Sequence, residues 1–112
     1  MQPNMPEIAT RSAAGMPATL IADGDGRSKH FRRFKELLTA LADQIGGADG
    51  LSPAQATALR NAAALQLRAE QLQGALVRGQ SVDGGELARV VMVADRLIDR
   101  LRRGRAATPI AA

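Results

Sequence analysis

The sequence predicts an all-α protein whose main part is a long antiparallel helical hairpin. Three observations support this prediction. Capping signals open two long segments after Ser52 and Asp83, apolar residues recur there every three or four positions, and only two of the 112 residues are aromatic. That period is typical of amphipathic helices, whereas sheets favour aromatic and β-branched residues. We therefore expect three helices, of which the second and third form the hairpin.

The first helix of the hairpin is expected over residues 53–78. Ser52 places a hydroxyl at the cap, Pro53 occupies the first helical position, and Gln55 is placed to close a capping box. Gly79 suits the left-handed conformation that ends many helices. The segment has few large apolar residues and many alanines, which permit close approach of a neighbouring backbone.

The second helix of the hairpin is expected over residues 84–103, because Asp83 opens it and Gly104 follows it. The turn of five residues before it returns the chain antiparallel to the preceding helix. Its apolar residues form a stripe that predicts the packing seam of the hairpin. These residues are Leu87, Val90, Val91, Ala94, Leu97, Ile98 and Leu101.

A shorter helix is expected over residues 28–45, with apolar residues at helical spacing and two glycines after it. With the hairpin it would form a helical oligomerisation domain, residues 28–104. Residues 1–27 mix Pro, Gly, Ala, Ser and Thr without a helical or strand period, so we expect a flexible N-terminal arm. Residues 105–112 are expected to form a flexible C-terminal tail.

Basic residues gather where the shorter helix begins. The predicted nucleic-acid-binding residues are Arg27, Lys29, Arg32, Arg33 and Lys35. Positive charge at a helix N-terminus opposes the helix dipole, so this placement indicates an anionic partner. The alternative is a solvated polar face, since long basic side chains often cover a core helix. A second excess of arginine lies between Arg96 and Arg105.

Few residues of this chain are of the types that catalyse reactions or bind metal ions and phosphate groups. The chain has no cysteine and one histidine, and no phosphate-binding or calcium-binding loop is evident. We therefore expect no catalytic residue, no metal, no cofactor and no enzymatic activity. No apolar run is long enough to span a bilayer and no secretory leader is evident, so a cytoplasmic location is expected.

The hairpin has more apolar surface than one short helix can cover. Met92 and Val93 lie off the predicted seam, and no aromatic core is available to anchor a monomer. Self-association is therefore expected. The alternative is a compact three-helix monomer, which is an ordinary solution for a domain of this size.

Several short motifs follow one another between residues 28 and 103. They are Lys29-His30-Phe31-Arg32-Arg33-Phe34, Ile45-Gly46-Gly47, Leu51-Ser52-Pro53-Ala54-Gln55, Glu70, Gly79-Gln80-Ser81-Val82-Asp83 and Leu97-Ile98-Asp99-Arg100-Leu101. This succession resembles small alanine- and arginine-rich proteins of alphaproteobacterial prophages and gene transfer agents, which look like small terminase subunits.

The resemblance implies a non-catalytic DNA-packaging factor of the bacterial host cell. Small terminases form rings through a helical hairpin, bind DNA and hand it to the large terminase, which holds the ATPase and nuclease. This chain lacks a recognisable N-terminal helix-turn-helix and aromatic stacking platforms, so its DNA binding is expected to be weak, mostly non-specific and directed at phosphates. Two alternatives stay open: a structural coiled-coil adaptor, and a small nucleoid-associated protein or transcriptional regulator.

Overall fold

Three helices make up the structure, a computed structural model that describes residues 28–107. They are α2 (Lys29–Gln44), α3 (Pro53–Val77) and α4 (Gly84–Ala107). No strand occurs in this part of the chain, so the prediction of an all-α fold with three helices is confirmed. The predicted N-terminal arm and residues 108–112 lie outside the described residues.

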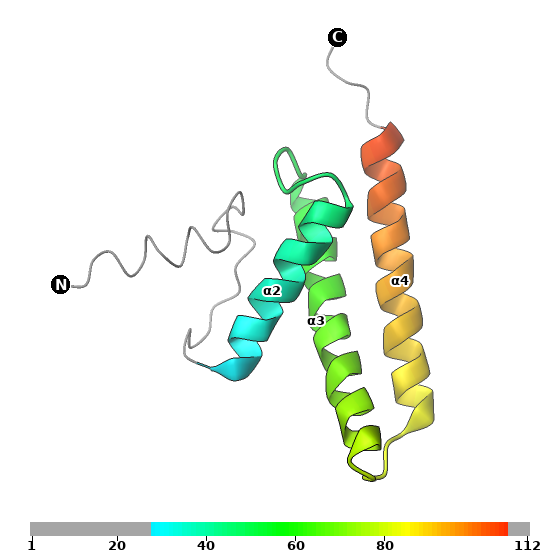
Figure 1. The fold of residues 1–112 in the computed structure, drawn as a ribbon. Coiled ribbons are helices and arrows are strands. Elements are labelled where there is room, and N and C mark those ends of the chain that lie inside the picture. The colour runs from blue at the N-terminus through cyan, green and yellow to red at the C-terminus, as the bar shows by residue number, and fades with distance from the viewer. Residues whose placement is uncertain (1–27, 108–112) are drawn as a thin grey trace, which may run out of the picture.

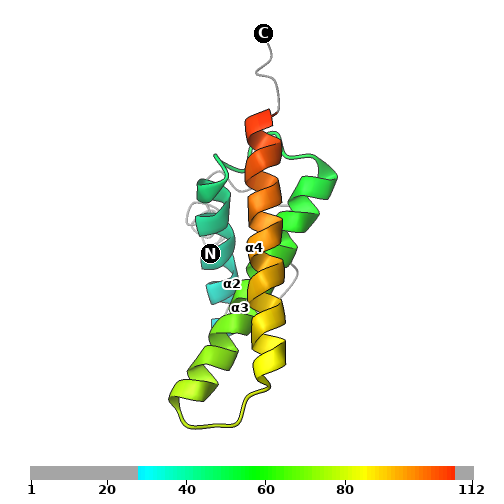
Figure 2. The same ribbon diagram turned by 90° about the vertical axis from the view of Figure 1, so that its right-hand side faces the viewer.

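The helices lie in the order α2, α3, α4, with α3 between the other two (Figure 1). Each runs antiparallel to the one before it, and Figure 2 shows α4 crossing α3 obliquely. At about 1.5 Å per residue, α2 is about 24 Å long, whereas α3 and α4 are each about 36 to 38 Å. The first turn of α2 lies level with Gln71, whose Nε2 is 3.5 Å from Nδ1 of His30. The hairpin therefore extends beyond α2 at its turn.

The hydrophobic core lies where all three helices meet. Leu38 and Leu41 of α2 and Leu59 of α3 are the largest fully buried side chains. From α4 the core includes Ile98 and Leu101. Every residue of the hairpin helices in this core lies within residues 53–68 or 94–107, which we call the covered half of the hairpin. We call residues 69–93 the turn half.

Local signals set the ends of the hairpin helices. Ser52 Oγ accepts a hydrogen bond from the Gln55 N–H at 3.1 Å, and Gln55 Oε1 accepts one from the Ser52 N–H at 2.8 Å, which is the expected capping box. Gly79 has φ +80° and follows the C-cap of α3. Asp83 Oδ1 accepts from the N–H groups of Gly85 and Glu86 at 2.9 and 3.2 Å, so it caps the start of α4.

The predicted end of the last helix is wrong. The sequence pattern predicts an end at residue 103 and a tail over residues 105–112, but α4 continues to Ala107. Gly104 has no positive φ and is part of the helix. Arg105 secures the last turn, because its guanidinium donates to the carbonyl oxygens of Asp49 at 2.8 Å and Gly46 at 3.5 Å. A long-range contact thus overrides the weak helix propensity of glycine.

The predicted seam of the last helix is buried unevenly. Ala94, Ile98 and Leu101 are buried, and all three lie in the covered half. The other four seam residues are only half-buried; they are Leu87, Val90, Val91 and Leu97. In the turn half, α3 buries Ala69 and Leu72. The hairpin therefore packs tightly where α2 lies against it and more loosely near its turn.

Candidate nucleic-acid and assembly surfaces

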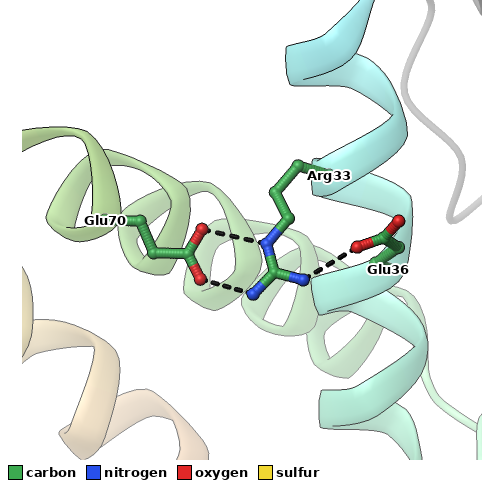
Figure 3. Close-up of polar contacts among 3 residues, drawn as sticks. All are labelled: Arg33, Glu36 and Glu70. Carbon is green, nitrogen blue, oxygen red and sulfur yellow. Dashed lines mark hydrogen bonds and ion pairs between the residues drawn. The ribbon is translucent and has the colours of Figure 1, made fainter. Parts of the chain in front are cut away.

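Arg33, predicted to bind nucleic acid, joins α2 to α3 (Figure 3). Its Nε and Nη2 donate to the two carboxylate oxygens of Glu70 at 2.9 and 2.6 Å, and its Nη1 donates to Glu36 at 2.8 Å. Two parallel bonds to one carboxylate fix the orientation of both groups. The hydrogen bonds from Arg33 hold the pKa of Glu70 below its usual value. The Arg33 guanidinium is thus already occupied by two carboxylates.

The other members of the predicted basic cluster differ in their surroundings. Lys35 is half-buried, with Nζ 5.0 Å from the centre of the Phe31 ring, a cation–π contact. Lys29 and Arg32 are exposed at the start of α2. Arg27 lies outside the described residues. The four described members of the cluster therefore do not share one uniform environment.

Two further ion pairs lie on the hairpin, one between α3 and α4 and one within α4. Arg68 of α3 donates from Nε and Nη2 to the carboxylate of Glu86 on α4, at 2.7 and 3.1 Å. These bonds lower the pKa of Glu86. Within α4, Arg103 pairs with Asp99 at 3.0 Å across one helical turn. Both pairs are largely exposed, so their contribution to stability is small.

Large apolar side chains stay exposed in the turn half. The exposed fractions are 50% for Leu76, 88% for Val77, 50% for Met92 and 41% for Val93. No other large apolar residue within residues 28–107 is exposed to this degree. Scattered single residues of this kind are normal on a protein surface, but here four lie within one half of a single hairpin.

A shallow groove of about 270 Å³ runs between α3 and α4. Its lining consists of Gln66, Ala69, Glu70, Gln73, Val91, Ala94 and Asp95. Glu70 already accepts two bonds from Arg33, so the orientation of its carboxylate is fixed. The lining side chains supply amide and carboxylate groups beside those of alanine and valine, and none of them is a typical nucleophile.

Metal-ligand clusters and membrane-spanning helices are both absent from residues 28–107. No three His, Asp or Glu side chains gather there in a way that would hold a metal ion. None of the three helices combines the length and apolarity needed to cross a bilayer. In comparisons with known proteins, no family model, no curated protein and no solved structure matches the chain.

Proposed function

We propose that this chain is a non-catalytic DNA-packaging factor similar to a small terminase subunit. In this proposal it assembles into a ring through its hairpin, binds DNA weakly through phosphates, and presents the DNA to a large terminase. The observation that carries the proposal is the exposure of Leu76, Val77, Met92 and Val93 in the turn half. The order of motifs along residues 28–103 supplies the link to terminases.

Association of hairpins is favoured because it removes this apolar surface from water. Each Å² of apolar surface removed from water contributes about 25 cal/mol, so a seam shared between neighbouring subunits would stabilise the assembly. Assembly also repeats the basic residues of every subunit. Weak contacts to successive phosphates of one DNA molecule then add through multivalency. A small domain without base-reading aromatic residues gains affinity for DNA in this way.

Native mass spectrometry of the full chain tests the assembly, alone and with a mixed-sequence DNA duplex. We expect a closed assembly of several copies, and a complex with DNA whose affinity falls steeply as salt is raised. A chain that stays monomeric at all concentrations and does not bind DNA at low salt would contradict the proposal.

A second candidate is a structural adaptor that docks its hairpin on a protein partner. The observation that favours it is the engagement of Arg33 by Glu70 and Glu36, which removes one strong cation from the predicted basic cluster. An adaptor would bind no DNA at low salt. An assembly that binds DNA in a salt-dependent manner therefore separates the packaging factor from the adaptor.

A further inference from the structure

Four arginines lie on the face of α4 that points away from the core. Buried Ala94, Ile98 and Leu101 define the inner face of this helix. With 3.6 residues per turn, positions 89, 96, 100 and 103 fall within an arc of about 60° on the opposite side. All four are exposed, and we call them the outer stripe: Arg89, Arg96, Arg100 and Arg103. It is about 21 Å long at a rise of about 1.5 Å per residue.

The outer stripe has little compensating negative charge. Arg96 and Arg100 make no hydrogen bond or ion pair with any residue from 28 to 107. Arg103 pairs with Asp99, but this is an exposed pair whose arginine can exchange its partner at small cost. Arg89 lowers the pKa of Glu86 through its charge, without a hydrogen bond, and the carboxylate of Glu86 is hydrogen-bonded to Arg68 instead.

The predicted basic cluster on α2 offers less. Its Arg33 is bound by two carboxylates, and releasing it would break the ion pair with Glu70 that joins α2 to α3. Its Lys35 is half-buried over Phe31. A phosphate would have to compete with contacts that also hold the fold together. On the outer stripe, binding a phosphate disturbs no contact between helices.

We propose that the outer stripe of α4 is the surface that contacts nucleic-acid phosphates. This inference rests on the proposed function. It assigns the main contact with DNA to the outer stripe instead of the basic cluster on α2. Arginine suits the role because its planar guanidinium donates two parallel hydrogen bonds to one phosphate. The stripe runs along one straight helix, so it can follow a stretch of DNA, which carries one charge for about every 1.7 Å of its axis.

The composition of this face favours nucleic acid over an anionic membrane. Helices that bind membranes place bulky apolar residues beside their basic residues and bury that apolar face in the lipid. On α4 the apolar seam packs on α3, and exposed Met92 and Val93 flank the outer stripe only near the turn. From residue 94 to residue 105 the outer face carries no large apolar side chain. A face of arginines without an apolar layer fits a polyanion in water.

The test compares double variants of the full chain that each remove two charges. Arg96→Gln/Arg100→Gln removes them from the outer stripe, and Lys29→Gln/Arg32→Gln removes them from α2. Binding to a mixed-sequence duplex is measured by fluorescence anisotropy at several salt concentrations. Native mass spectrometry checks that assembly is retained.

The matched control removes one charge from α3, at Arg60, and one from its C-cap residue, Arg78; we call it the α3 control. Arg60→Gln/Arg78→Gln has the same net charge as the other two variants, so any difference among the three reports the position of the charges. We expect the stripe variant to bind about tenfold more weakly or worse, and its salt slope to fall by about one for each phosphate that it no longer neutralises. The α3 control should stay within about twofold of wild type, and the α2 variant should lie between them.

Four results would overturn the proposal. Equal effects in all three variants, or an effect confined to the α2 variant, would overturn the stripe while leaving DNA binding by the chain intact. Absence of DNA binding by the wild type would overturn both the stripe and the proposed function. Binding of the wild type to phosphatidylserine vesicles but not to DNA would also overturn the stripe as a nucleic-acid surface.

Discussion

The two halves of one hairpin differ in what their side chains do. In the covered half, α2 lies on the hairpin, and Leu59, Ile98 and Leu101 are part of the core. In the turn half, the same two helices leave Leu76 and Met92 half-exposed. The helical pattern is continuous through both halves. The difference arises because α2 is shorter than its neighbours and does not reach the turn of the hairpin. One half therefore contributes to the core, whereas the other leaves large apolar side chains in water, and we propose that this second half associates with other subunits.

The largest expected effect is a loss of core packing in the covered half. Leu59 is fully buried, so Leu59→Ala should lower the free energy of unfolding by about 2 to 5 kcal/mol. Leu76→Ala, the matched change in the turn half, should cost less than about 1 kcal/mol within one subunit because half of this residue is already exposed. Urea unfolding monitored by circular dichroism, at a concentration where the chain is monomeric, gives both values. Equal costs would show that the halves do not differ.

The helix caps at the two ends of the hairpin should have smaller effects. Ser52→Ala removes the side-chain acceptor for Gln55, and we expect a loss of about 1 kcal/mol. Asp83→Ala removes an acceptor for two N–H groups at the turn, with a loss of similar size. The same urea unfolding experiment applies. The distinguishing readout is hydrogen exchange: Ser52→Ala should raise exchange in the covered half, and Asp83→Ala should raise it near the turn. Identical exchange patterns would argue against two independent halves.

The smallest effect is expected at the ion pair that marks the boundary between the halves. The pKa of Glu70 is lowered in the folded state, so its carboxylate stabilises the fold above its unfolded pKa, and this contribution is lost as the pH falls through the folded pKa. Glu70→Gln should therefore lower the urea midpoint slightly at pH 7. Because Glu70 is more than one third exposed, screening keeps the effect small.

The difference between Glu70→Gln and wild type should vanish well below about pH 4, the ordinary range for glutamate. The matched control is Glu36→Gln, which leaves both bonds from Arg33 to Glu70 in place and should change the midpoint less. A Glu70→Gln difference that stays constant from pH 7 to acid pH would show that the carboxylate does not stabilise the fold through its charge.

The sequence is sufficient to predict the features that depend on neighbours in the chain. The capping box at Ser52, the left-handed Gly79 and the cap at Asp83 all follow from residues within a few positions of one another. The helix bounds agree with the structure within one residue, except at the end of α4. There Arg105 contacts the loop before α3, more than 50 positions away, which no local pattern reveals.

The candidate surfaces are harder to predict for the same reason. The basic cluster on α2 is visible in the sequence, but the pairing partner of Arg33, Glu70, lies 37 residues away. Which part of the seam is buried depends on where α2 crosses the hairpin. The outer stripe on α4 has a local signal, because its arginines recur at intervals of seven, four and three residues opposite the apolar seam. That spacing is readable once the inner face of the helix is known.

The mass of the assembly in solution tests the central claim most directly, that the turn half of the hairpin is the assembly surface. Native mass spectrometry should be run on wild type and on Leu76→Ser/Val77→Ser, with Ala54→Ser/Ala64→Ser as a control at exposed positions of the covered half. We predict a multi-copy assembly for wild type and the control, and a folded monomer for the turn-half variant. An assembly of unchanged mass in the turn-half variant, or a monomeric wild type, would contradict the claim.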